Sequence, residues 1–436
     1  MIGLHGDPRR FKLNKTRHDV DAALRRLVGD AYAHVALFRN RMDDAGVRPD
    51  ALQAVADLER LPATNRQTLA STHRADFLRT GTDPATCRRA RTSGTTGTPI
   101  DVFMSPVEAF YRRVLLLKAI RRNTRLPFRF TIAEVGTGGV RAERDGAGQA
   151  SFVARVVRIS RLTPVAEQAT RALDARPDVV TGPPSCLELL ADTLAERRAA
   201  VRPRLVVSRG EVLRAATRTH LETVFRCKVV DYYSCDEVGN IAWQCPDDPT
   251  LMHVNTDGCV VEVLDDDRRC LPGVPGRVVL TNLYNWTMPF IRYELSDRAV
   301  LLPEGGSACR CGHRGPSLSL VEGREGDHLW TTDGQRVSPR SVDSLVALAS
   351  LRENADGYAV RRYQVVQEED GRLHVRVIPE TQDPGLLAGR IESSLRRLDP
   401  RLSVDVEFVR ELPTEPSGKF RAVYSKWRPP TATNRD

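Results

Sequence analysis

The sequence predicts a layered α/β body followed by a small α+β domain. Short apolar strands alternate with helical segments between residues 179 and 233, an order typical of a largely parallel sheet covered by helices. After residue 323 the order changes to hairpin, helix and strand. We therefore expect a large domain over residues 1–323 and a small, mobile domain over residues 324–436.

Composition excludes several classes of protein. Apolar residues make up 41% of the 436 and charged residues 28%, which is typical of soluble globular chains. No apolar run approaches the roughly 18 to 20 residues of a membrane span, and the polar N-terminus lacks an apolar signal core. We therefore expect a cytoplasmic protein without a membrane partner; a homodimer stays open. The net charge of +9 is spread along the chain and aromatic residues are only 6%, so we expect no nucleic-acid partner.

The elements of the large domain follow from spacing. Residues 17–80 have apolar positions at helical spacing, and residues 106–122 repeat that pattern. Ser185 and Glu188 have the spacing of a capping box for a helix that runs through Leu194. Strands are expected at 179–180, 205–207, 229–230, 260–263 and 277–281.

The small domain shows equally regular signals. Strands 360–366 and 373–378 flank Glu369-Asp370-Gly371, a hairpin signal. A helix over 387–398 follows, and residues 402–408 alternate apolar and polar as a half-buried strand does.

A Gly/Thr-rich stretch precedes the helix at 106. Glycine permits close backbone approach, and hydroxyl groups add hydrogen-bond donors, so the stretch suits an anion such as a triphosphate. It is not a Walker loop, because no Lys follows its second glycine. An ordinary surface turn is the alternative. The residues are Thr92, Ser93, Gly94, Thr95, Thr96 and Gly97.

Four later stretches carry groups that a nucleotide-activating site needs. Tyr233 to Glu237 follows a strand and brings an aromatic ring and two carboxylates, Asp236 and Glu237. Asp297 follows an apolar strand, Arg324 lies at the expected domain junction, and Lys419 lies on a Gly/Pro-rich loop. A Mg²⁺-competent carboxylate, an acid for ribose hydroxyls, a phosphate loop and a mobile cation together predict nucleotide activation.

With these motifs the chain resembles the adenylate-forming superfamily, in its branch of phenylacetate–CoA ligase-like and coenzyme F390 synthetase-like proteins. The resemblance runs from roughly residue 30 to residue 427. It implies that Thr92–Gly97 is the phosphate loop and that Gly210 and Glu211 line the adenine pocket. It also implies that Tyr233 packs on adenine, that Glu237 binds Mg²⁺, that Asp297 holds the ribose, and that Lys419 reaches the carboxylate and α-phosphate.

Three positions depart from the pattern of this family. Asp236 stands where a Thr or Ser normally contacts the adenylate phosphate, and a carboxylate there repels phosphate unless a metal or Arg intervenes. Ser296 replaces a Gly, and Gly326 stands where an acidic hinge residue is usual. A specialised enzyme and a degenerate nucleotide-binding homologue both accommodate these departures.

A second set of residues predicts a zinc site. Cys309 and Cys311 form a close thiol pair, and Cys245 and His253 supply two more ligands. Four such ligands suit a closed, structural tetrahedral site. His313 competes with His253 as the fourth ligand, and unligated thiols are the alternative.

The function expected from the resemblance is an ATP-dependent acid ligase. A carboxylic acid, aryl or short acyl, attacks ATP to give acyl-AMP and pyrophosphate, with Mg²⁺ as cofactor. The acyl group then passes to coenzyme A, after rotation of the small domain. The alternatives are transfer to an amine, a hydroxyl or a carrier protein, and nucleotide binding without turnover.

Overall fold

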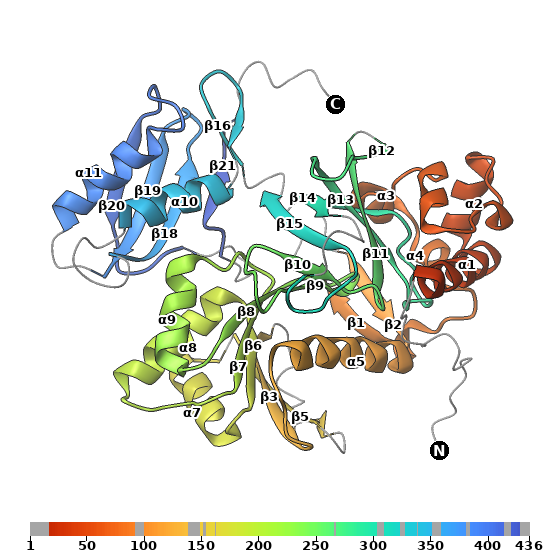
Figure 1. Cartoon of the computed structure of the whole chain (residues 1–436), viewed down its shortest axis with the longest axis horizontal. Helices are drawn as coiled ribbons and strands as arrows, with labels where there is room; N and C mark the ends of the chain where they lie inside the picture. The colour runs from red at the N-terminus through yellow and green to blue at the C-terminus, as the bar shows by residue number, and fades with distance from the viewer. Residues whose placement is uncertain are drawn as a thin grey trace. The chain divides into compact units, whose positions relative to one another are not determined.

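The chain forms two compact units, each built from two separate stretches. The computed structural model describes residues 17–427, apart from 92–99, 138–148, 151–153, 162, 266, 303–308, 323–327, 338, 351–358, 381–383 and 414–419. Unit 1 comprises Met1–Asn123 and Tyr232–Leu320, and unit 2 comprises Thr124–Asp231 and Val321–Asp436 (Figure 1). The mixed α/β class is as expected, whereas the domain boundary at residue 323 stays a prediction. None of the helices described is long and apolar enough to cross a bilayer.

Unit 1 begins with the helical region expected from residue 17 onward. Helix α1 buries Leu24, Leu27 and Val28, which share one face because they lie three or four residues apart. The side chain of Asn65 accepts a hydrogen bond from Thr68 N at 2.8 Å and so caps helix α3. The helical elements are α1 (Arg17–His34), α2 (Ala36–Asp44), η2 (Pro49–Ala51), η3 (Val55–Arg60), α3 (Arg66–Ser71), α4 (Arg74–Phe77), η4 (Pro84–Thr86) and α5 (Pro106–Asn123).

The strands of unit 1 are mostly antiparallel, in contrast to the parallel order predicted from residues 179–233. A hairpin of β1 (Arg88–Arg91) and β2 (Asp101–Met104) precedes α5. The remaining strands run in the order β12-β11-β13-β14-β15-β10-β9-β8. Their bounds are β8 (Val229–Cys235), β9 (Gly239–Gln244), β10 (Met252–Val254), β11 (Cys259–Asp265), β12 (Arg268–Arg269), β13 (Pro275–Asn282), β14 (Tyr293–Leu302) and β15 (Ser317–Glu322).

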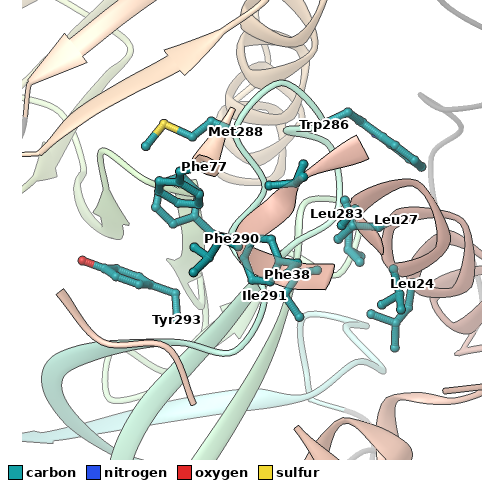
Figure 2. Packing of buried hydrophobic residues seen from close by; sticks show 14 of the residues in the cluster. Leu24, Leu27, Phe38, Phe77, Leu283, Trp286, Met288, Phe290, Ile291 and Tyr293 are labelled. Atoms are coloured by element: carbon teal, nitrogen blue, oxygen red, sulfur yellow. The ribbon is translucent and has the colours of Figure 1, made fainter. Parts of the chain in front are cut away.

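A buried loop, residues 283–292, connects β13 to β14 and forms part of the core of unit 1. Figure 2 shows Leu283, Trp286 and Phe290 of this loop among side chains of α1, α2 and α4. The rings of Phe77 and Phe290 meet edge to face with centroids 5.4 Å apart. The loop therefore ties the N-terminal helices to the strands that follow.

Helix α5 is attached to this loop through one buried carboxylate, that of Glu108, which is 3% exposed. Glu108 Oε2 accepts from Ser105 N at 2.6 Å, and Ser105 Oγ accepts from Glu108 N at 3.3 Å, which forms a capping box. The same carboxylate accepts the backbone N–H groups of Trp286 and Thr287 at 2.8 and 3.0 Å and the Thr287 hydroxyl at 2.6 Å. A loop without regular structure has its backbone donors satisfied in this way.

Unit 2 contains the parallel sheet that the sequence predicted, in the order β7-β6-β3-β5-β4, with all but the β4–β5 pair parallel. Helices α7, α8 and α9 pack beside these strands (Figure 1). Their apolar faces and the strands share one core. The bounds are β3 (Phe130–Thr137), β4 (Gln149–Ala150), β5 (Ala154–Ser160), α7 (Val165–Ala175), β6 (Val179–Gly182), α8 (Pro184–Glu196), β7 (Leu205–Arg209) and α9 (Ala215–Phe225).

The capping box predicted for Ser185 and Glu188 is wrong. The residue that precedes helix α8 is Pro183, which makes no side-chain cap. Ser185 instead donates to Glu211, and Glu188 accepts from Thr217 at 2.5 Å. Both side chains therefore form hydrogen bonds with residues distant in the sequence instead of capping the helix.

The C-terminal part of unit 2 is the α+β structure expected after residue 323. Its four-stranded sheet has the order β20-β19-β18-β21, and α10 and α11 pack against each other over it (Figure 1). The β18–β19 pair is the predicted hairpin around Gly371. The bounds are β16 (Leu329–Trp330), β17 (Arg336–Val337), α10 (Pro339–Ser350), β18 (Val360–Gln367), β19 (Leu373–Pro379), α11 (Pro384–Leu395), β20 (Val404–Phe408) and β21 (Val423–Ser425).

Glu108→Ala is expected to lower the free energy of unfolding by at least about 2 kcal/mol, because it leaves buried backbone N–H groups without an acceptor. Urea denaturation compares it with Glu59→Ala, an exposed acid of unit 1 that should change stability by less than about 0.5 kcal/mol. Equal stability of the two variants would contradict the role given to Glu108.

Candidate functional site

Two of the predicted motifs meet in unit 1 although they lie about 60 residues apart. Tyr233 Oη donates to Asp297 Oδ2 at 2.6 Å, and Tyr293 Oη donates to Glu237 Oε1 at 3.2 Å. Each motif therefore supplies a tyrosine to the acid of the other. The sequence singled out three of these residues but missed Tyr293, although it lies in the same apolar stretch as Asp297.

Glu237 lies in the turn between β8 and β9, where its side chain is 5% exposed, whereas the neighbouring Asp236 is exposed. Its hydrogen-bond partner Tyr293 is neutral, and burial raises the pKa of that phenol. A buried carboxylate whose partner is uncharged is a favourable ligand for a divalent cation. Glu237 therefore fits the Mg²⁺ role that the resemblance implies.

In unit 2, the predicted residues Gly210 and Glu211 lie just after the carboxyl end of β7, where α/β proteins place their sites. Glu211 follows β7 and accepts from Ser185 N at 3.1 Å and Ser185 Oγ at 3.0 Å. Burial raises the pKa of Glu211. Gly210 has φ +83°, a left-handed conformation that suits glycine. At the end of β3, a Cβ on Gly136 would come within 2.7 Å of Cys186 Sγ, so only glycine fits there.

The residue after Lys419 is described, although Lys419 is not. Phe420 is 8% exposed, and the guanidinium carbons of Arg214 and Arg362 lie 5.5 and 4.9 Å from the centre of its ring. The carboxylate of Glu188 lies 3.9 Å from Arg214 and 3.0 Å from Arg362. Cations over an aromatic face are attracted by its quadrupole, so these groups hold Phe420 in unit 2. The predicted residues outside the described part of the chain are Thr92, Ser93, Gly94, Thr95, Thr96, Gly97, Arg324 and Lys419.

The predicted zinc ligands come together in unit 1. One ligand atom from each of Cys245, His253, Cys309 and Cys311 lies within 4.8 Å of every other. Cys245 Sγ is 3.4 Å from Cys309 Sγ, and His253 Nε2 is 3.1 Å from Cys311 Sγ. The four residues that the sequence grouped thus lie together in unit 1, and their role as zinc ligands stays a prediction.

The surroundings of His253 decide which histidine completes the set. His253 Nδ1 lies 2.9 Å from Ser317 Oγ, which leaves Nε2 directed at the thiols. Burial and the neighbouring His313 lower the pKa of His253 to about 4, so its imidazole is neutral and able to ligate near pH 7. The His313 ring stacks on His253 with centroids 4.1 Å apart. His253 is therefore the fourth member of the set, and His313 packs beside it.

The thiols also fit a metal. Burial raises the pKa of Cys311 to about 12, and its interactions with the thiols of Cys309 and Cys245 also raise it. A hydrogen bond from the backbone of Cys311 lowers the pKa of Cys309. A Zn²⁺ ion would supply the positive charge that thiolates need at neutral pH.

Among proteins of known activity, the chain is similar to phenylacetate–coenzyme A ligases. It is 27% identical over 374 residues to that of Thermus thermophilus, covering 82% of this chain and 80% of the relative. It is 26% identical over 314 residues to that of Escherichia coli, covering 69% of each chain. No family model matches the chain.

The fold is that of solved coenzyme A ligases. A 2-hydroxyisobutyryl-CoA ligase in the postadenylation state, in complex with R3-HIB-AMP, matches with a TM-score of 0.77 and 18% identity, covering 96% of this chain and 91% of that one. A benzoate CoA ligase from Burkholderia xenovorans matches with a TM-score of 0.52 and 17% identity, covering 79% and 69%. Over most of its length the chain is therefore similar in sequence to phenylacetate–coenzyme A ligases, and it has the fold of solved coenzyme A ligases.

Proposed function

We propose that this protein is an AMP-forming acid–coenzyme A ligase. The proposal is based on two hydrogen bonds that join the two motifs, one from Tyr233 to Asp297 and one from Tyr293 to Glu237. They bring an aromatic ring, an acid for ribose and an acid for Mg²⁺ into one part of unit 1. The likeness to phenylacetate–CoA ligases supports the same activity.

The roles of the residues follow from their chemistry. Asp297 accepts the ribose hydroxyls in place of the Tyr233 hydroxyl, and the freed Tyr233 ring packs against adenine. Gly210 and Glu211, which follow β7 in unit 2, are proposed to contact adenine, as the resemblance implies. Glu237 holds Mg²⁺, which neutralises phosphate charge when bound. Thr92–Gly97 are proposed to hold the β- and γ-phosphates, and Arg324 is proposed to bind the nucleotide.

The reaction proceeds in two steps. An oxygen of the carboxylate attacks the α-phosphorus of ATP, the bond to the β-phosphate oxygen breaks, and pyrophosphate leaves. Lys419 stabilises the charge that develops on the α-phosphate and on the carboxylate. In the second step the thiol sulfur of coenzyme A attacks the acyl carbon and AMP leaves, after the domain that carries Lys419 has turned away.

The acid is proposed to be an aryl or short acyl acid. ATP–pyrophosphate exchange with a panel of such acids tests the first step, and thioester formation with coenzyme A tests the second. Exchange without thioester formation would favour an amine, a hydroxyl or a carrier protein as acceptor. No exchange and intact MgATP binding would indicate a nucleotide-binding homologue without turnover.

Lys419→Ala is expected to abolish ATP–pyrophosphate exchange and to spare thioester formation from supplied acyl-AMP, because Lys419 acts only where charge develops on the α-phosphate. The matched control is Lys426→Ala, which removes a lysine paired with Glu368 at 2.6 Å in the same unit. Exchange at the wild-type rate in Lys419→Ala would show that the assigned role is wrong.

Glu237→Gln is expected to lower the rate of exchange by about 100-fold or more, because it removes the charge that holds Mg²⁺. Rates measured over a range of Mg²⁺ concentrations should show a higher Mg²⁺ requirement. Asp265→Asn changes an exposed acid of unit 1 and serves as the control. An unchanged Mg²⁺ dependence in Glu237→Gln would rule out the metal role.

The four-residue thiol–imidazole cluster is proposed to hold one structural zinc ion, ligated by Cys245, His253, Cys309 and Cys311. Elemental analysis of protein purified without chelator is expected to find about one zinc per chain, with Zn–S distances near 2.3 Å by X-ray absorption. Cys311→Ser should lose the ion and melt at a lower temperature. Cys270→Ser, which lies outside the cluster, should retain it. Protein without bound metal would contradict the proposal.

A further inference from the structure

The turn that carries Asp236 and Glu237 is held by side chains at every carbonyl from residue 235 to residue 238. Arg112 Nη2 and Nη1 donate to the first and second carbonyls at 3.3 and 2.9 Å. Asn282 Nδ2 donates to the third at 3.0 Å, and Tyr284 Oη donates to the fourth at 2.6 Å. We call this stretch the 235–238 turn. Its backbone is therefore fixed from outside, and the direction of the Glu237 side chain is fixed with it.

Arg112 differs from the other two donors because it brings a charge. It comes from the middle of α5, and its guanidinium spans two successive carbonyls as a planar fork can. The turn leaves room for it at Gly239, where a Cβ would come within 2.9 Å of Arg112 Nε and 2.8 Å of Tyr284 Oη. Gly239 also has φ +83°, a conformation that glycine adopts without strain. The close approach of Arg112 therefore depends on a glycine at this position.

The charge of Arg112 lies beside the acids of the turn. Burial lowers the pKa of Arg112, but its interactions with Tyr284, Asp236, Cys235 and Glu237 raise it, and the net shift is upward. Asp236 is the residue that departs from the Thr or Ser usual in this family. A carboxylate that faces an incoming triphosphate raises the energy of the bound state, and a cation nearby reduces that repulsion.

We propose that Arg112 is a positioning residue that clamps the 235–238 turn and offsets the negative charge of Asp236, so that MgATP can bind beside Glu237. The inference rests on the proposed function of the site. The guanidinium faces the backbone side of the turn, so it does not need to touch the nucleotide. The observation behind the inference is the double contact of the guanidinium with the carbonyls of Cys235 and Asp236.

The test is a double-mutant cycle. Arg112→Met removes the charge and both donors but keeps a long side chain, and Asp236→Ser restores the hydroxyl. Arg112→Met is expected to raise the KM for MgATP in the exchange assay roughly tenfold, the effect of losing a charge-assisted hydrogen bond. In the Asp236→Ser background, Arg112→Met should raise the KM for MgATP less than about threefold, because the negative charge that Arg112 offsets is absent.

Two further variants separate charge from packing. Arg112→Lys keeps the charge and is expected to recover most of the lost affinity for MgATP. Arg121→Met removes an exposed arginine near the end of the same helix and should leave the KM unchanged. Melting temperatures of all variants show whether each is folded.

An equal effect of Arg112→Met in both backgrounds would overturn the proposal, because a merely structural residue does not sense the charge at position 236. So would a wild-type KM in Arg112→Met. If the wild-type protein catalysed no ATP–pyrophosphate exchange with any of the acids tested, the proposed function would fail. Calorimetric titration with MgATP of the wild type, the two single variants and the double variant would then test the inference. The effect of Arg112→Met on MgATP affinity would again be compared between the two backgrounds.

Discussion

The structure of unit 1 depends on satisfying the backbone of the buried 283–292 loop. A chain segment without regular structure can be buried only if its N–H and C=O groups find partners. Glu108 supplies acceptors for Trp286 and Thr287, and Asn282 Oδ1 accepts from Tyr284 N and Asn285 N at 2.9 and 3.0 Å. Once held, the loop contributes apolar side chains to the core and leads directly into the strand that carries Tyr293 and Asp297.

The same loop also reaches the other half of the site. Asn282, the last residue of β13, and Tyr284, near the start of the loop, donate to the backbone of the 235–238 turn. The positions of Glu237 and Asp297 are thus set by one connected arrangement of hydrogen bonds rather than by two independent motifs. A site that acts through electrostatic stabilisation benefits from such rigidity, because charged groups that are already in place need not reorganise when charge develops during the reaction. The thiol–imidazole cluster adds a second tie in this unit, between residues 245–253 and 309–311.

The arginines of this basic chain serve interior roles as well as surface ones. Arg292 is 1% exposed and lies 3.3 Å from Glu262, which is itself 2% exposed. In unit 2, Arg214 and Arg362 lie on the ring of Phe420 with Glu188 beside them. A buried guanidinium is tolerated where carboxylates, carbonyls and aromatic faces surround it. These three arginines therefore contribute to the interior of the protein as well as to its net charge.

The sequence by itself determined the class of fold and predicted the candidate site residues. Helical spacing, strand alternation and the Gly371 hairpin are local signals, so α5, β18–β19 and the C-terminal helix could be predicted from them. The four thiol and imidazole ligands could be grouped because only a few residue types bind zinc.

What surrounds these groups was decided by the tertiary structure. Arg112, Glu108 and Tyr293 have no motif of their own, and the local capping box of Ser185 lost to a distant partner, Glu211. Their roles depend on which segments meet in space, and contacts between residues far apart in the chain leave no periodic signal in one sequence.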